Sequence, residues 1–475
     1  MMFETHPFRL PLKPPAEVLV LIGVSVSLVL AFIAARMEIE PFWLLLAALA
    51  GLLLPLLLQS PVLLMVALVY VGTFKTQAAV GVSLRDPTLL TAALLYVAVI
   101  IRVLVAGVGA GGYSLRELFA GQSVGVIAAC LLVLVIAISW AYSPAADVGK
   151  DKVLKLLVFD LPAFLAPFIL LRTREDVRHL LLLCMLGSLL LASHTMNRAL
   201  HPTVQILLGQ DDPTQISEGL LTGAAALMAL HYPFRTKRLF HFGLIALIIV
   251  FTCGVIVSVS RSAILSYFIV TSCSLIFLWR RLPAHPRKRV LLAVAAVIVI
   301  VPVAFAFLWN LPAMHAKFVV KTAELTSAIK GTPLPGTADQ RYVFSTSAIN
   351  AFLAKPLLGW GAGGWSTLWH YSDDDRVVTY PHNFVLEIAA EQGLLGLSVL
   401  ALLFLAALRA GVRILRDQHI RAIFILPVAA LMALGNAVTG QIDDRCMWFF
   451  FGALFALARM TRVGDHSTDF RQSAY

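Results

Sequence analysis

Residues 381–407 read PHNFVLEIAAEQGLLGLSVLALLFLAA, a polar start followed by a long apolar run. Proline enters a helix only at its first turn and asparagine is a favoured N-cap, so Pro381 and Asn383 predict that a helix begins here. The run over 384–407 is long enough to cross a bilayer. The polar residues at its start, His382 among them, are therefore expected at the membrane–water boundary, where chemistry on a lipid-linked substrate would take place.

The rest of the chain has the same apolar character. It has 475 residues, of which 60% are hydrophobic and 13% charged, and this composition excludes an ordinary soluble globular domain. A membrane-spanning helix needs about 20 apolar residues. We expect spans near 16–35, 41–59, 61–74, 88–108, 122–142, 154–171, 178–193, 216–233, 240–258, 263–279, 290–309, 384–408, 420–437 and 447–460. The prediction is an all-α polytopic membrane protein with 12 to 14 transmembrane helices. The number is a range because Pro61 separates the second and third runs and the third is short.

The formal net charge is +11, which raises the question of a nucleic-acid partner. The basic residues do not form one patch. They lie in short clusters between apolar runs, as the positive-inside rule predicts, so no nucleic-acid partner is expected. Counting spans puts four clusters on one side, assigned to the cytoplasm with both termini: 172–178, 235–238, 280–289 and 409–421. Lys150, Lys152 and Lys155 fall on the outer side, where we expect contact with anionic headgroups.

Neither the cysteines nor the acidic residues predict a metal site. Four of the five cysteines lie within apolar runs without ligand spacing, and the fifth, Cys446, has no evident disulfide partner. The aspartates at 373–375 would suit a divalent cation, although an acidic loop tip is the commoner explanation. We therefore expect no metal and no cofactor.

The chain divides into N-terminal transmembrane helices (1–309), a large outer loop (310–383) and C-terminal helices with a cytoplasmic tail (384–475). Loops as long as the middle part are usually functional. Within it, 338–354 is expected to form a helix along the membrane, and the glycines over 359–364 a flexible turn.

Two shorter outer segments accompany that loop. One is a polar loop over 194–215 that carries His194 and Arg198, and the other is the turn Ser258-Val259-Ser260-Arg261-Ser262. An arginine in such a turn costs a few kcal/mol if it faces lipid. Arg261 is therefore expected either to grip a phosphate through its guanidinium fork or to extend its side chain to the interface.

Arg341 lies on the same outer side and by itself would be a solvated loop residue. Two arginines together would neutralise a diphosphate without a metal, because their charge is fixed at any physiological pH. His382 is the candidate general base, since an unperturbed histidine titrates near ~6.5 and a large neutral fraction is available to accept a proton. The alternative is an interfacial histidine bonded to the backbone.

Glu387 and Glu391 are four residues apart and share a helix face. Carboxylates in a spanning helix need partners, so we expect them to pair with arginines and to support the cavity rather than to catalyse. Asp160 is a further charge inside a span, suited either to a proton relay or to an ion pair with a neighbouring helix.

Several of these motifs together resemble a known family. Pro381-His382-Asn383-Phe384, Leu386-Glu387 and the run Glu391-Gln392-Gly393-Leu394-Leu395-Gly396-Leu397 look like the signature of the O-antigen ligase and polymerase superfamily. Residues 355–363 (KPLLGWGAG) resemble its Pro-x-x-Gly-x-Gly element, and Ser260-Arg261-Ser262 its Ser-Arg turn. Arg341 stands where the family often has an arginine. The resemblance is strongest over 240–410.

The resemblance implies an inverting membrane glycosyltransferase with a fold related to the C-type glycosyltransferases. Its donor would be a glycan on undecaprenyl diphosphate, and its acceptor the lipid A core or another glycan, at the periplasmic face of the bacterial inner membrane. By position, Arg261 and Arg341 would hold the diphosphate and His382 would activate the acceptor hydroxyl. Asn383, Glu387 and Glu391 would support them, and no metal would be needed.

Three alternatives remain at this point. A polymerase of the same superfamily would use the same motifs on a different acceptor. A transporter of lipid-linked sugars typically shows inverted repeats and interrupted helices, and the sequence indicates neither. A purely structural membrane subunit would fit only a disordered outer loop.

Overall fold

The structure, a computed structural model, describes residues 61–74, 87–105, 122–200, 214–232, 238–281, 306, 337–368, 379–416 and 423–463. Every regular element in these ranges is helical. Among the residues that the structure describes, five stretches are apolar and long enough to cross a membrane: Val124–Tyr142, Ala146–Leu170, Arg174–Leu200, Arg261–Arg280 and Phe384–Arg416. The protein is therefore an all-α polytopic membrane protein, as predicted. The expected spans 16–35 and 41–59, nearly all of 290–309, and the aspartates at 373–375 lie outside the described residues.

Most of the described helices follow the predicted apolar runs, but α7, which lies before the span expected over 154–171, was not predicted. The described helices are α3 (Pro61–Val71), α4 (Pro87–Val105), α6 (Ser123–Ser139), α7 (Ala146–Lys155), α8 (Leu161–Leu170), α9 (Arg174–Leu200), α11 (Thr214–Leu230), α12 (Arg238–Val257), α13 (Arg261–Arg281), α16 (Thr337–Ala354), α17 (Phe384–Arg416), α18 (Ile425–Thr439) and α19 (Arg445–Val463). A π-helical turn, Leu156–Asp160, joins α7 to α8. The helix expected over 338–354 is confirmed as α16.

The polar loop predicted from residue 194 is wrong at its start. Helix α9 continues to Leu200, so His194 and Arg198 lie on a helix rather than in a loop. The reason is a partner on α11: the Arg198 guanidinium donates to the buried Glu218 carboxylate, which also accepts a hydrogen bond from Thr195 Oγ1 at 3.1 Å. Polarity alone predicted a surface loop, but an internal ion pair lets the helix continue.

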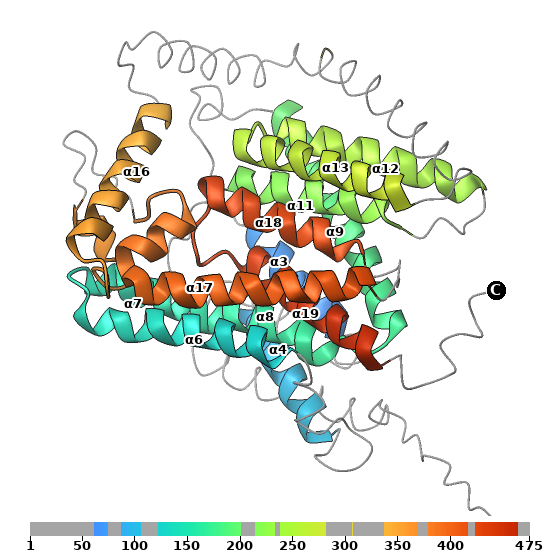
Figure 1. The fold of residues 1–475 in the computed structure, drawn as a ribbon. Helices are drawn as coiled ribbons and strands as arrows, with labels where there is room; N and C mark the ends of the chain where they lie inside the picture. Colours follow the sequence, from blue (N-terminus) through green and yellow to red (C-terminus); the bar gives the residue numbers. More distant parts are fainter. Residues whose placement is uncertain are drawn as a thin grey trace, which may run out of the picture.

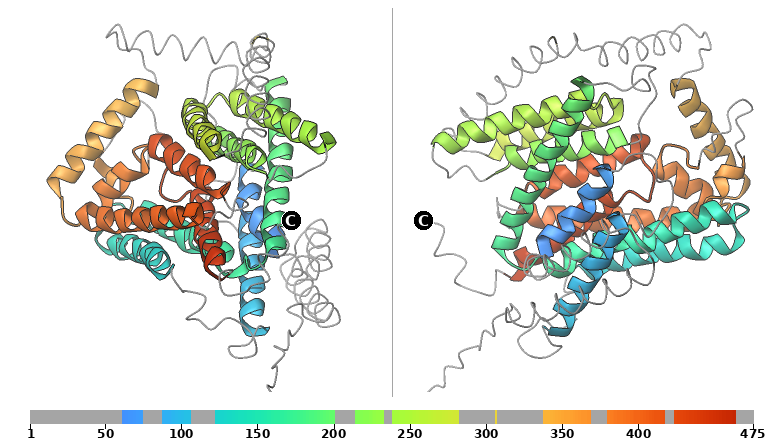
Figure 2. Two further views of the ribbon diagram at one scale, coloured as in Figure 1. Left: turned by 45° about the vertical axis from the view of Figure 1, so that its right-hand side comes forward. Right: turned by 180° about the vertical axis from the view of Figure 1, so that it is seen from behind.

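Most of the long helices run side by side, as Figures 1 and 2 show. Helix α17 packs along α6 and α19, and α19 packs against α8. Helix α11 contacts α9, α12, α13 and α18. Helix α16 stands apart at one end of this bundle, at the left of Figure 1, where it contacts α17.

Helix α17 is interrupted, which the sequence reading did not predict. Gly393 has φ 63° and ψ −152°, so two helical pieces, 384–392 and 394–416, meet at a kink. The span predicted over 384–408 is confirmed within Phe384–Arg416, and the kink lies inside it. A left-handed conformation of this kind is open to glycine at little cost, whereas a Cβ would be strained. Here a Cβ would also meet the backbone of Leu357 at 2.6 Å.

The segment 355–361 supplies the hydrogen bonds that the break removes. Leu394 N–H donates to the Pro356 carbonyl at 2.7 Å, and Leu395 N–H donates to the Leu357 carbonyl at 3.2 Å. In the other direction, Gly361 N–H donates to the Glu391 carbonyl at 2.8 Å. A broken helix is tolerated at membrane depth only where its backbone groups are bonded within the protein. The Pro-x-x-Gly-x-Gly element is therefore the structural complement of the break.

We expect Gly361→Ala to lower the free energy of unfolding by at least about 2 kcal/mol, because of left-handed strain and a clash with a neighbouring backbone. Gly361 has φ 84°, and a Cβ there would lie 2.5 Å from the Ser139 carbonyl oxygen. The matched control is Gly243→Ala in α12, where nothing lies within 4 Å. Thermal unfolding in detergent measures both variants, and equal midpoints would contradict this account.

Candidate functional site

The His382 imidazole contacts two aromatic rings. The Phe344 ring of α16 stacks on it with centroids 5.7 Å apart and planes 25° apart. The centroid of the Tyr380 ring, two residues earlier in the chain, lies 4.5 Å from the centroid of the imidazole. Phe344 is itself held by the buried Trp365, whose ring it meets edge-on at 5.7 Å. The imidazole is thus held in place by helix α16 and by the turn before α17.

Arg341 reaches the same place because it precedes Phe344 by three residues on α16, which puts both on one helix face. Arg341 is close enough to Tyr380 to affect the pKa of the Tyr380 hydroxyl. Burial raises the pKa of the Tyr380 hydroxyl above its ordinary value, and the carboxylates of Asp443 and Glu387 raise the pKa further, whereas Arg341 lowers it. The hydroxyl therefore remains protonated at physiological pH.

Two described residues other than glycine have a left-handed backbone, and both lie at candidate site positions. His382 has φ 55°, and Val259, two residues before Arg261, has φ 54°. For a β-branched residue such as valine this is a genuine outlier. Strained backbone tends to occur at functional sites, where the surrounding structure holds it in place. Ser260 N–H and the Ser258 hydroxyl, 3.4 Å apart, help to fix the turn.

Asn383 caps α17 as predicted. Its Oδ1 accepts hydrogen bonds from the backbone N–H groups of Val385 at 2.9 Å and Leu386 at 3.0 Å. The cap satisfies two of the N–H groups that every helix start leaves without a partner. The start of α17, and with it the place of His382 one residue earlier, is fixed by this side chain.

The predicted pairing of Glu387 and Glu391 with arginines is wrong in its partner. Both carboxylates instead meet Lys152 of α7: its Nζ lies 2.6 Å from Glu387 Oε1 and 2.7 Å from Glu391 Oε2. Contact between Lys152 and lipid headgroups, expected from the loop count, is wrong for the same reason, because its side chain is only 6% exposed. The supporting role expected for the two glutamates agrees with this arrangement.

A loop between α18 and α19 connects the start of α17 to the turn that carries Arg261. Ile442 N–H donates to Glu387 Oε2 at 3.0 Å. Three residues earlier in the chain, the Thr439 hydroxyl donates to Ser262 Oγ at 2.7 Å. Arg261 is thus tied through its neighbour Ser262 to the loop that contacts Glu387, while the helix that bears Arg341 contacts His382 through Phe344.

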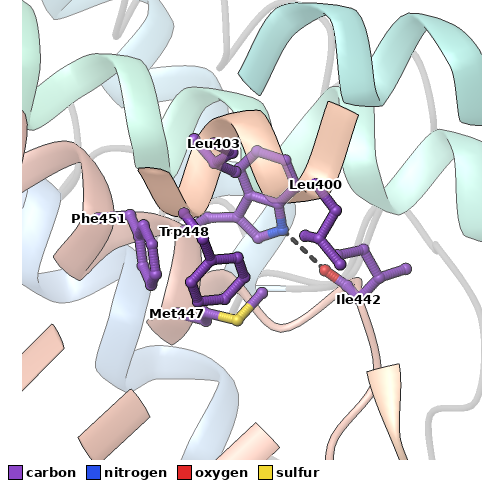
Figure 3. A pocket seen from close by; sticks show the side chains of 7 residues that line it. Leu400, Leu403, Ile442, Met447, Trp448 and Phe451 are labelled. Carbon is purple, nitrogen blue, oxygen red and sulfur yellow. Dashed lines mark hydrogen bonds between the residues drawn. The ribbon is translucent and has the colours of Figure 1, made fainter. Parts of the chain in front are cut away.

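Beneath that loop lies a small apolar cavity, shown in Figure 3. Side chains of α17 and α19 line it, Leu403 and Trp448 among them, together with Ile442. The Trp448 indole N–H donates to the Ile442 carbonyl at 2.7 Å (Figure 3). Ile442 is therefore bonded on both sides, through its N–H to Glu387 and through its carbonyl to Trp448, which fixes the loop.

The comparison with protein families bears on this region directly. Residues 245–401 match the family described as O-Antigen ligase. This chain contains an O-antigen ligase domain. The match supports the resemblance to the O-antigen ligase and polymerase superfamily, whose members are glycosyltransferase-like enzymes. No curated protein matches the chain.

The O-antigen ligase domain includes Arg261, Arg341 and His382, but it does not hold all of the groups around them. Lys152 lies before the matched range, and the loop 440–444 lies after it. Sequence reasoning missed Lys152 as a buried residue and missed Asp443 and Asp444. The signal for Lys152 was faint: two carboxylates in an apolar helix need a cation, and no arginine is near them in the sequence.

Asp160 ends the π-helical turn between α7 and α8 and is 1% exposed. Charges close to it include Asp443, Arg445 and Lys155. Of these, Lys155 Nζ lies 3.6 Å from Asp443 Oδ2. Both readings of Asp160, a proton relay and an ion pair with a neighbouring helix, stay predictions, because aspartates as well as cations surround it. Among the described residues, no group of three or more histidine, cysteine or acidic side chains is arranged to hold a metal ion.

Proposed function

We propose that this protein is an inverting glycosyltransferase of the O-antigen ligase type. It would transfer a glycan from undecaprenyl diphosphate to an acceptor hydroxyl of the lipid A core, at the periplasmic face of the bacterial inner membrane. One observation carries the proposal: the His382 imidazole is stacked against the helix that bears Arg341, inside an O-antigen ligase domain. A base beside a fixed cation is the pair that glycosyl transfer from a diphosphate requires.

The chemistry is a single displacement. The acceptor oxygen forms a bond to the anomeric carbon, and the bond from that carbon to the diphosphate oxygen breaks, which inverts the configuration. His382 takes the hydroxyl proton, and the diphosphate leaves on its lipid carrier. Arg261 and Arg341 would hold the diphosphate through bidentate hydrogen bonds and offset the charge that grows on it. The proposal includes no metal and no cofactor.

The arrangement around the base favours this role. Phe344 and Tyr380 restrict the imidazole, so little rotational freedom is lost when the acceptor binds. The left-handed backbone at His382 indicates that the surrounding contacts, rather than local preference, set its position. A base fixed in this way is oriented before the substrate arrives.

A transporter of lipid-linked sugars is the second candidate, and the break in α17 is the observation that favours it, since interrupted helices are typical of transporters. Reconstituted vesicles separate the two functions. A transporter would move labelled donor across the bilayer without any covalent product, whereas the proposed enzyme forms a new glycosidic bond.

Deletion of the gene in its native host tests the proposed function. We expect lipid-linked polymer to accumulate while the lipid A core remains bare, as seen by gel analysis of surface glycans. A plasmid copy of the unmodified gene should restore the ladder of bands that glycan-bearing lipid A core gives on the gel, and a copy with His382→Asn should not. Core that carries a single repeat would instead indicate a polymerase of the same superfamily, and an unchanged ladder would overturn both.

A further inference from the structure

Three charged side chains are buried together where α7 meets the start of α17. Lys152 Nζ lies 2.6 Å from Glu387 Oε1 and 2.7 Å from both carboxylate oxygens of Glu391. The exposed fractions of these side chains are 6%, 0% and 1%. Burying charge is costly unless partners compensate it, and removing one partner leaves the others uncompensated. With both carboxylates ionised, two carboxylates and one ammonium give this cluster a net charge of −1.

Each carboxylate residue of the cluster also holds a segment of the candidate site. Glu387 accepts from the Ile442 N–H, which fixes the loop 440–444. The backbone carbonyl of Glu391 accepts from Gly361 N–H, which fixes the glycine element at the break in α17. Both lie within nine residues of His382, on the short helical piece 384–392. Lys152 is the cation that holds the two carboxylates close together.

We propose that Lys152 is a positioning residue for the transfer reaction: it holds the first two turns of α17, and through them His382, in the reactive geometry. This inference rests on the proposed function. Lys152 does not touch the reacting atoms in this scheme. Without its charge, two buried carboxylates one helical turn apart repel each other, and the short piece 384–392 is free to shift against the loop 440–444.

A shift of the base is expected to reduce catalysis more than binding. Misplacement of a catalytic group by 1 Å costs on the order of 10²-fold in rate. The donor diphosphate, in contrast, would be held by Arg261 and Arg341, which lie on other helices. Lys152→Gln should therefore lower kcat by roughly 30- to 100-fold and leave the donor KM within about threefold.

A charge-matched double variant separates positioning from mere stability. Lys152→Gln with Glu391→Gln restores the net charge of −1 and keeps the bond between Glu387 and Ile442. We expect it to recover at least about tenfold of the lost kcat. Lys150→Met is the matched control, because Lys150 is exposed on the same helix, and its kcat should equal that of the unmodified enzyme.

The measurement is transfer of glycan from purified lipid-linked donor by full-length protein in detergent, with monodispersity and thermal unfolding as checks of folding. A wild-type kcat in Lys152→Gln would overturn the inference, and so would a folded double variant no better than a folded single variant. If the single variant does not fold, an inactive but folded double variant overturns it as well. Failure of the unmodified protein to transfer glycan would instead refute the proposed function.

Discussion

Replacing His382 with alanine should reduce glycan transfer by about 10²- to 10⁴-fold, the range over which general bases contribute. The reason is local: the imidazole is the titratable group stacked against the arginine-bearing helix, and an alanine cannot accept the proton of the acceptor hydroxyl. The loss of activity should appear mainly in kcat, because a general base acts during the chemical step, when the proton is transferred. Initial rates with purified donor and acceptor measure the effect.

His382→Asn is the control that isolates the chemistry. Asparagine adopts left-handed backbone more readily than most residues, so it suits the φ of 55° at this position. It can donate and accept hydrogen bonds, yet it is no base. We expect the asparagine variant to fold like the unmodified protein and to be as inactive as the alanine variant. Substantial transfer by either variant would remove His382 from the mechanism.

Lysine at Arg261 or Arg341 should be a poor substitute, even though it preserves the charge. The planar guanidinium offers paired donors to a phosphate, whereas an ammonium is a compact point charge. We expect alanine at either position to cost about 10²- to 10³-fold in kcat, and lysine to recover less than a tenth of that loss. Rates across a range of donor concentrations separate weaker binding from slower chemistry.

The control for these variants is Arg178→Lys on α9. The Arg178 side chain is 62% exposed and lies beside Glu175. It should behave like the unmodified enzyme. Activity should also persist in chelator, because the two guanidinium groups would supply the positive charge that a metal gives to other transferases. Full activity of the lysine variants, or a chelator-induced loss restored by magnesium, would redirect the mechanism toward a bound cation.

Local signals in the sequence were sufficient for most of the helices. The apolar runs predicted most of the helices that the structure describes, although not α7, and Pro381 with Asn383 marked the start of α17 within a residue. Such features depend on residues close together in the chain, so pattern and propensity report them directly. The short helix over 338–354 was predictable for the same reason.

Features that depend on distant partners were not predictable. Lys152 looked like an interfacial lysine, because its carboxylate partners lie more than 230 residues later in the chain. Arg198 looked like a loop residue until Glu218 of the next helix gave it a partner. The break at Gly393 had a local sequence signal, the glycine itself. The break is tolerated, however, because the backbone of 355–361 forms hydrogen bonds with the helix on both sides of it. In each case tertiary context overrode the local reading.

The buried lysine also has a consequence for how the chain is made. Lys152 leaves the ribosome 239 residues before Glu391, which at typical translation rates is a delay of roughly 12 to 48 s. During that interval its ammonium has no counterion from α17 and must stay hydrated or be shielded by the insertion machinery. The reaction centre would therefore be completed late in biogenesis, and truncated products that end before α17 should be prime targets for membrane quality control.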